Sequence, residues 1–226
     1  MPNQLNATQH HSEASNHLTI THDRTFNGKP LYYHEGGLIL EYLADIEQVL
    51  TKALNQYPRL FAVHLNLNLP SHFRGDYLTV FAHFFHTLEL ETNELCKDKY
   101  ANNTYQHPQT VIRYIWAREC DSTSQHHLIL LFDRELFQSL GTGRGSWGRF
   151  LHKKVRKTWD RVMEAHSNQR CSGLAYSPNN EGFELLSDTE TFPLQLNEFF
   201  YRMSRLAKPI TKYGDNRSTS FGCSRR

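Results

Sequence analysis

The chain contains two groups of residues whose types could support chemistry on a phosphodiester. The first is Gln125-His126-His127, directly before the apolar run 128–132. Alternate side chains of a strand point to opposite faces, so Gln125 and His127 would share one face and His126 the other. Imidazole nitrogens and amide oxygens are competent ligands for a divalent cation, and Glu119 could reach the same place. A metal site is one interpretation, and polar residues at a hairpin end are the simpler alternative.

The second group lies on the last predicted helix and consists of Tyr201, Arg205 and Lys208. Their spacing of four and three places all three on one helix face. A tyrosine beside cations could have a stabilised phenolate, which is what a nucleophile on a phosphodiester needs. The alternative interpretation is that the cations only interact with the helix dipole at its C-terminal end.

These groups depend on a sheet and helices that the hydrophobic pattern predicts. Residues 61–69 alternate, with His64, Asn66 and Asn68 on the face opposite the apolar side chains. Residues 110–119 and 125–132 form an antiparallel hairpin in this interpretation. Further short strands are expected at 173–177 and 183–186, and helices at 38–54, 76–97, 134–140, 147–166 and 194–207. This order is typical of an α+β fold with a central, mostly antiparallel sheet flanked by helices.

The composition divides the chain into one domain and two tails. Residues 1–30 are polar without periodicity and predict a flexible tail, 31–210 form the domain, and 211–226 form a basic tail. No stretch is apolar enough for a membrane span, and the N-terminus lacks the layout of a signal peptide. The four widely spaced cysteines fit a reducing compartment. We therefore expect a cytoplasmic protein without membrane contact.

Positive charge is concentrated in the second half of the chain. Residues 1–143 have 10 Lys and Arg against 15 Asp and Glu, whereas residues 144–226 have 15 against 8. Such a balance favours a polyanionic partner, because neutralising phosphates releases counterions. An ordinary solvated face is the alternative. The basic residues that we expect to contact such a polyanion are Arg149, Lys153, Lys154, Arg156, Lys157, Arg205, Lys212 and Arg217.

Four separated blocks carry a family resemblance: VIRYIWAREC, HHLILLFDRELFQSLG, RMSRLAKPITK and RSTSFGCS. In this order they resemble the inovirus-type gene II product family of phage and prophage replication proteins, which includes the bacterial YagK/YfjJ-type proteins. The resemblance covers roughly residues 30–226. It implies kinship with the HUH endonucleases, which initiate rolling-circle replication, and therefore an HUH/Rep-like fold for the domain.

The resemblance also implies roles for individual residues. In that superfamily two histidines bind a divalent cation that polarises the scissile phosphate, and a tyrosine on a helix attacks it. His127 matches the second histidine, Gln125 replaces the first, and Glu119 would be a third ligand of Mg²⁺ or Mn²⁺. Arg205 stands where the family has its tyrosine, which leaves Tyr201 as the candidate nucleophile. Lys208 matches the family lysine.

Three functions follow as expectations. The first is a replication initiator that nicks single-stranded or hairpin origin DNA by tyrosyl transfer, with a host helicase for unwinding. The second is a degenerate relative that binds DNA without cleaving it, since both departures fall on chemically demanding positions. The third is a regulatory or structural prophage protein without DNA contact.

Overall fold

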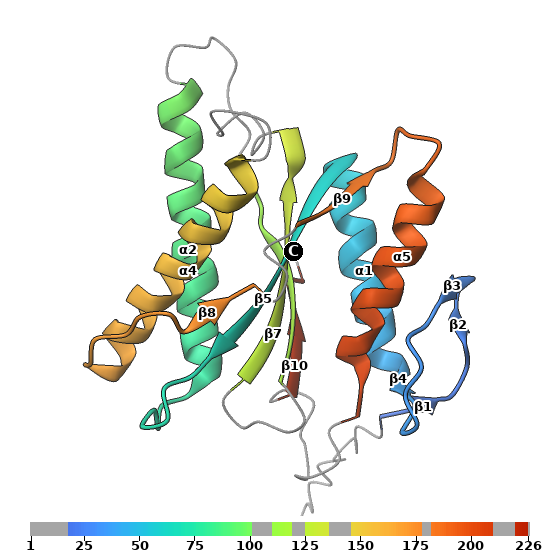
Figure 1. Ribbon diagram of the computed structural model, residues 1–226, viewed down its shortest axis with the longest axis horizontal. Coiled ribbons are helices and arrows are strands. Elements are labelled where there is room, and N and C mark those ends of the chain that lie inside the picture. Colours follow the sequence, from blue (N-terminus) through green and yellow to red (C-terminus); the bar gives the residue numbers. More distant parts are fainter. Residues whose placement is uncertain are drawn as a thin grey trace, which may run out of the picture.

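The structure, a computed structural model, has three layers with the sheet in the middle (Figure 1). It describes residues 18–100, 110–118, 125–135, 146–177, 182–209 and 220–225. The sheet order is β10-β6-β7-β5-β8, with β9 also paired to β5, and every pairing is antiparallel. Its strands are β5 (Arg59–Asn68), β6 (Arg113–Arg118), β7 (Gln125–Asp133), β8 (Ala175–Tyr176), β9 (Gly182–Leu186) and β10 (Phe221–Cys223). The predicted α+β fold is confirmed.

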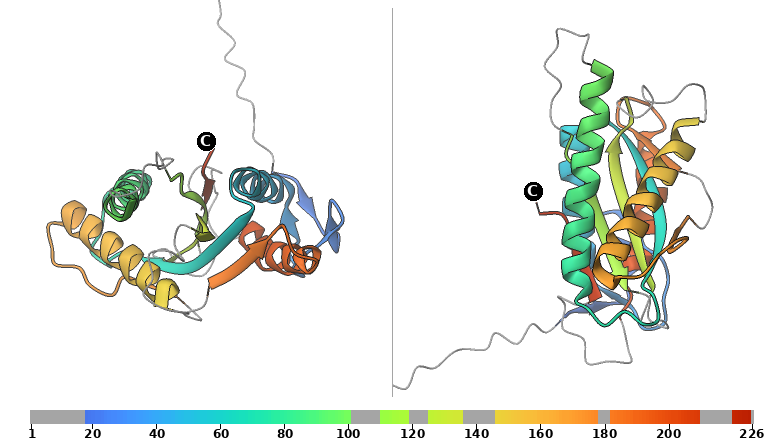
Figure 2. Two further views of the ribbon diagram at one scale, coloured as in Figure 1. Left: turned by 90° about the horizontal axis from the view of Figure 1, so that it is seen from above. Right: turned by 90° about the vertical axis from the view of Figure 1, so that its left-hand side faces the viewer.

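Within the described residues, two helices cover each face of this sheet (Figures 1 and 2). They are α2 (Tyr77–Tyr100) and α4 (Ser146–Ser167) on one face, and α1 (Leu40–Gln56) and α5 (Phe192–Ser204) on the other. A 3₁₀ helix, η1 (Arg205–Ala207), continues α5. Of the predicted helix 134–140, residues 136–140 lie outside the described part of the chain. No helix of the described ranges has the length and apolarity to cross a bilayer.

The alternation of β5 explains why two separate cores form. Val63, Leu65 and Leu67 are fully buried against α2 and α4, whereas Ala62 packs with α1 and α5. Because successive side chains point to opposite faces, His64 and Asn66 lie on the α5 side. Helices cover both faces of β5. The high apolar content of β5 is therefore consistent with its interior position in the sheet.

The edge strand beside β5 is interrupted. β8 pairs with Asn66 and Leu67, and β9 pairs with the range Arg59–Val63, both antiparallel to β5. Only two residues of β5 separate these paired stretches, whereas the five residues 177–181 join β8 to β9. An excess of residues on one strand is the feature that defines a bulge, and bulges often lie beside functional sites. The interruption falls beside His64.

The ring of Phe61 lies so close to the backbone at position 182 that a side chain there would collide with it. A Cβ built on Gly182 would lie 1.7 Å from Cζ of Phe61. We therefore expect Gly182→Ala to lower the free energy of unfolding by about 1–3 kcal/mol, because the ring must move. Urea denaturation measures this change. Phe61→Leu removes the ring edge, so the double variant should be less destabilised than the sum of the single variants, and strict additivity would contradict this explanation.

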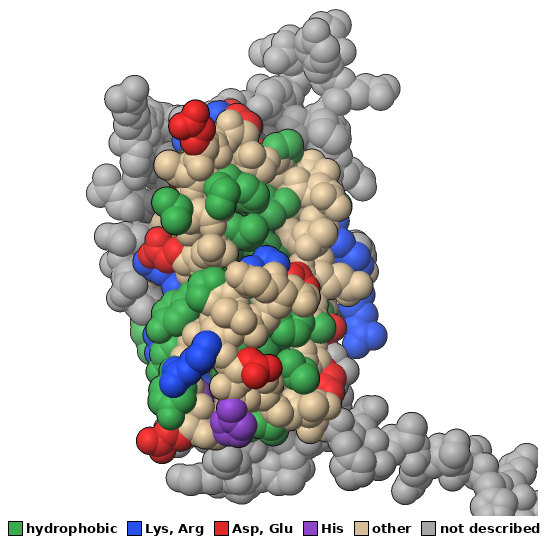
Figure 3. Space-filling view, turned by 90° about the vertical axis from the view of Figure 1, so that its right-hand side faces the viewer, with side chains coloured by type: hydrophobic (Ala, Val, Ile, Leu, Met, Phe, Trp, Pro, Cys, Tyr) green, Lys and Arg blue, Asp and Glu red, His purple; other side chains and the backbone are tan. Residues whose placement is uncertain are grey.

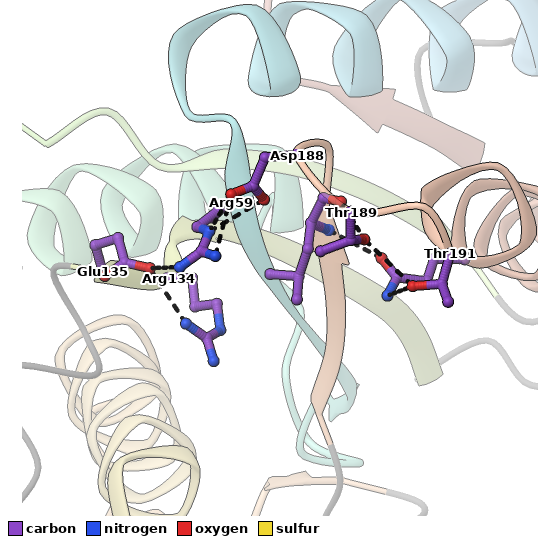
Figure 4. A network of polar contacts seen from close by, with 8 residues as sticks. Arg59, Arg134, Glu135, Asp188, Thr189 and Thr191 are labelled. Atoms are coloured by element: carbon purple, nitrogen blue, oxygen red, sulfur yellow. Dashed lines mark hydrogen bonds and ion pairs between the residues drawn. The ribbon is translucent and has the colours of Figure 1, made fainter.

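A polar network fixes the turn between β9 and α5 (Figure 4). Nε of Arg59 donates to both carboxylate oxygens of Asp188 at 3.1 Å, and its Nη1 donates to Glu135 at 3.0 Å. The hydrogen bond from Arg59 holds the pKa of Asp188 below its ordinary value. Thr189 Oγ1 donates to the Leu186 carbonyl at 2.8 Å. The network joins the start of β5 and the end of β7 to the turn that leads into α5.

The structure differs from the prediction of a tail at residues 1–30. Residues 1–17 lie outside the described part, but β1 (Ile20–Thr21) pairs with β4 (Leu38–Ile39). β2 (Thr25–Phe26) and β3 (Lys29–Pro30) form a hairpin across Asn27-Gly28, where both residues have positive φ. Asn-Gly is the preferred sequence for such a two-residue turn. Phe26 then stacks on Phe200 of α5 with ring centroids 6.2 Å apart.

The end of the chain also differs from a simple basic tail. β10 lies within the predicted tail 211–226 and pairs with β6 at the edge of the sheet. Phe221 stacks on Tyr42 of α1 with ring centroids 4.2 Å apart and is 4% exposed. Burial of the Phe221 ring stabilises β10. The polar residues around Phe221 gave little reason to predict a strand there.

Candidate nucleic-acid-binding site

A solvent-accessible cavity of about 670 Å³ lies between the sheet and the α5–η1 segment. The sheet contributes the polar side chains His64, Asn66, Arg118 and His127. The helical segment contributes Arg202, Arg205 and Lys208. Ser177 and Gly182, which flank the interruption of the edge strand, also line the cavity. The cavity therefore lies where β5 is left without an edge partner.

Two histidines and an asparagine form a hydrogen-bonded group on the sheet. Asn66 pairs with His127 across β5 and β7, so their side chains share a face. The His127 Nδ1 lies 2.7 Å from Asn66 Oδ1 and 3.3 Å from His64 Nε2. Because an amide oxygen only accepts, a hydrogen bond in this contact requires the His127 tautomer with its proton on Nδ1.

The environment keeps His64 uncharged at neutral pH. Burial lowers the pKa of His64 to about 4, with further contributions from the charges of His127 and Arg205. The imidazolium form is disfavoured because it loses hydration and faces other cations. Because the charge of Arg205 lowers the pKa of His64, the guanidinium of Arg205 lies near the histidine pair.

Tyr32 orients two of the cavity cations. The Cζ of Arg205 lies 5.0 Å from the centroid of the Tyr32 ring, and the Nζ of Lys208 lies 5.5 Å from it. The backbone N–H of Tyr32 donates to Ser204 Oγ at 2.9 Å, which ties this segment to the end of α5. Cations over an aromatic face are stabilised by its quadrupole. Two positive charges are therefore held together at the cavity rim.

Cations are more concentrated at the cavity than on the face of the molecule drawn in Figure 3. Figure 3 shows the side of the molecule that faces right in Figure 1, where acidic and basic side chains are interspersed among apolar and polar ones. Among the described residues that line the cavity, by contrast, four are Arg or Lys and none is Asp, Glu or Tyr. Like charges gathered in one cavity focus its field on an anion.

The predicted metal ligands Gln125 and His127 have different surroundings in the structure. His127 lines the cavity, but Gln125 does not, and Nε2 of Gln125 donates to the Tyr176 hydroxyl at 2.6 Å. Glu119 lies outside the described residues. Within the described ranges, no group of three His, Cys, Asp or Glu side chains could hold a metal ion. His126 is fully buried on the opposite face, as alternation predicts, with its ring centroid 5.1 Å from that of Phe81.

Tyr201 lies near Arg205 and Lys208, beside the same Tyr32 ring, but outside the lining of the cavity. Those two cations line the cavity, whereas Tyr201 does not line it, is 42% exposed and meets the edge of the Tyr32 ring at 6.0 Å. The prediction of one shared face assumed a continuous α-helix, whereas the chain changes to 3₁₀ geometry over Arg205–Ala207. All three side chains nevertheless contact the Tyr32 ring.

The basic helix α4 lies on the opposite face of the sheet from the cavity. Its residues Lys154 and Arg161 form ion pairs with Glu91 of α2, and Thr158 donates to the same carboxylate at 2.9 Å. These charges are neutralised between two helices. Desolvation by this burial lowers the pKa of Lys154.

Three other cations of α4, Lys153, Arg156 and Lys157, are exposed. They share a helix face with Asp160, which accepts hydrogen bonds from the backbone of Gly173 and Leu174 just before β8. The helix that carries them packs against β8, the edge strand beside the cavity. The side chain of Arg149 and all of Lys212 and Arg217 lie outside the described part of the chain.

Comparison with known proteins agrees with the blocks found in the sequence. The profile of the YagK/YfjJ C-terminal domain family matches residues 21–224. The chain belongs to this family. The uncharacterized protein YagK of Escherichia coli (strain K12) is 25% identical over 199 residues, which are 82% of this chain and 93% of YagK. No solved structure matches. The range that the YagK/YfjJ profile matches spans nearly all of the described fold, from β1 to β10. It contains every described residue that lines the cavity.

Proposed function

We propose that this protein of the YagK/YfjJ family binds single-stranded DNA without cleaving it, and that the cavity holds the backbone phosphates. The observation that carries the proposal is the composition of the cavity. Arg205 and Lys208 face a histidine pair of which His64 is uncharged, and the described lining contains no tyrosine and no carboxylate. Such a site can bind an anion strongly but holds no described oxygen nucleophile of the tyrosyl type.

The position of Arg205 favours a phosphate over a metal ion. A guanidinium that lowers the pKa of His64 also repels a divalent cation bound to that ring. The same charge attracts phosphate oxygens, to which a guanidinium donates two parallel hydrogen bonds. Arg205 replaces the tyrosine that the resemblance places there, so the substitution exchanges a nucleophile for a phosphate ligand.

The surroundings of the cavity favour a single strand over a duplex. The site lies at an interrupted sheet edge, and α4, which carries three exposed cations, packs against β8 at that edge. A flexible single strand can follow such a bent path, with phosphates on the cations. A duplex would have to bend sharply to place one phosphate in the cavity, which costs elastic energy.

Fluorescence anisotropy with a labelled dT₂₀ oligonucleotide and the matching duplex tests this proposal. We expect tighter binding of the single strand and an affinity that falls with rising salt. Failure to bind either nucleic acid, or binding that salt does not weaken, would favour the third expectation, a regulatory or structural protein without DNA contact.

The second candidate function is metal-assisted nicking, which the His64–His127–Asn66 group favours. If the proton of His127 moved from Nδ1 to Nε2, two imidazole nitrogens and one amide oxygen would form a donor set that fits Mn²⁺ better than Mg²⁺, because Mg²⁺ prefers oxygen ligands. A divalent cation there would supply Lewis-acid polarisation of the scissile phosphate. On this candidate the protein would be related in mechanism to HUH initiators and would rely on a host helicase in the cytoplasm.

The substitution Tyr201→Phe separates the two candidates. Because Tyr201 does not line the cavity, we expect the affinity for single-stranded DNA to change by less than about twofold. We also expect no covalent adduct from the wild type on a supercoiled plasmid with the cognate origin and Mn²⁺. An adduct that Tyr201→Phe abolishes would establish the nicking function. An adduct that survives would place the nucleophile elsewhere, and peptide mapping would then examine Tyr176, the partner of Gln125.

A further inference from the structure

We propose that the guanidinium of Arg202 is a preformed platform on which one unstacked nucleobase lies inside the cavity. This inference rests on the proposed binding of single-stranded DNA and assigns the base-recognising part of that site. Arg202 is neither one of the sequence-predicted contacts nor one of the two cations that Tyr32 orients. It lines the cavity from α5, on the turn of helix before Arg205.

Two neighbours hold this guanidinium in position. Its Cζ lies 5.2 Å from the ring centroid of Phe183 in β9, and it forms an ion pair with Glu198 one helical turn earlier. Phe199 supports the Phe183 ring with centroids 5.3 Å apart. One side of the guanidinium therefore lies on an aromatic ring, and its edge is held by a carboxylate. Preorganisation of this kind lowers the entropy lost when a ligand stacks on the other side.

The remaining lining of the cavity suits a planar, partly apolar ring. Phe199, Met203, Leu206 and Ile129 supply apolar surface beside Arg202, and the cavity volume of about 670 Å³ is within the range of small-molecule sites. Bases of single strands commonly stack on arginine guanidinium planes and aromatic rings. Arg202 and Arg205 are three residues apart, so base and phosphate would be held by neighbouring turns of one helical segment.

A simpler role for Arg202 makes a different prediction. The Arg202 and Glu198 side chains are 53% and 55% exposed, and an exposed ion pair of this spacing contributes little to stability. If Arg202 acts only as a positive charge, lysine at this position should serve equally well. If it acts as a stacking plane, lysine should fail although it keeps the charge, because an ammonium group has no planar face.

The experiment combines Arg202→Lys with two oligonucleotides of equal length, dT₁₂ and a twelve-unit abasic chain with the same phosphates. We expect Arg202→Lys to weaken dT₁₂ binding by roughly tenfold while leaving affinity for the abasic chain and the salt dependence unchanged. Phe183→Leu keeps an apolar contact but removes the ring under the guanidinium, so it should reproduce part of the loss on dT₁₂ alone. Circular dichroism melting of each variant confirms that the fold is retained.

Each other outcome contradicts a specific step. Equal binding of dT₁₂ by Arg202→Lys and wild type would overturn the stacking platform and leave the proposed function intact. An equal loss on both oligonucleotides would also overturn it, because the effect would then lie in charge or packing. Wild-type protein that binds neither oligonucleotide would overturn the proposed function and this inference with it.

Discussion

Arg205→Gln is expected to weaken binding of single-stranded DNA by about 10- to 100-fold, since hydrogen bonds to charged groups contribute about 1.5–3 kcal/mol. Arg205 lines the cavity and lies over the Tyr32 ring, so its guanidinium is held where a phosphate would enter. Removing one phosphate contact should also lower the slope of log K against log salt by about 0.7 for a single strand. Anisotropy titrations at several salt concentrations measure both quantities.

The matched control for this prediction removes a charge from the opposite layer. Lys97 of α2 is 69% exposed and pairs with Glu94. Lys97→Gln should therefore change neither the affinity nor the slope beyond the small effect of net charge. If Lys97→Gln and Arg205→Gln weaken binding equally, the cavity is not the phosphate site and DNA binding is a diffuse charge effect.

Acidification from pH 7 to pH 4 is expected to lower the free energy of unfolding by roughly 2–3 kcal/mol through His64 alone. The pKa of His64 is lowered from 6.5 to about 4 in the folded protein, chiefly by burial. Below pH 6.5 the unfolded chain takes up a proton that the folded chain does not. The contribution of His64 is therefore complete above pH 6.5 and is lost progressively as the pH falls towards 4.

Chemical denaturation at a series of pH values tests this expectation with two variants. His64→Gln should flatten the pH dependence between 4 and 6.5. His72→Gln, which changes an exposed histidine in the segment before α2, should retain the wild-type pH dependence. A wild-type pH profile in His64→Gln would show that His64 is not held neutral by the fold.

The sheet and its helices were predictable because their signals are local. The alternation over 61–69 correctly separated His64 and Asn66 from the apolar face. Pro58 correctly indicated the end of α1, because the residue before a proline is pushed out of helical geometry. Asn27-Gly28 is a sequence typical of a hairpin turn, and it could have predicted this hairpin. The polar composition of residues 1–30 led instead to the prediction of a flexible tail.

The cavity was predictable only in part, because strand order is not a local property. The sequence predicted site residues at the polar start of β7 and on the last helical segment, and His127, Arg205 and Lys208 from these two places line one cavity. The pairing of β5 with β7 brings His64 and Asn66 to His127 from a distance of about sixty residues along the chain. From the sequence alone, where this pairing is not known, Gln125 and Glu119 were the candidate metal ligands closest to His127 along the chain. The signal for Arg202 was weaker still, because it depends on Phe183 from another strand.

The most direct test of the central claim is to locate bound DNA by photo-cross-linking with an oligonucleotide that contains 4-thiothymidine, followed by peptide mapping. Our account predicts cross-links on the α5 side of the sheet, in peptides that contain β5, β9 or the α5–η1 segment. Arg205→Gln should reduce their yield. Cross-links confined to α2 and the α2-facing side of α4 would contradict the claim that nucleic acid enters this cavity.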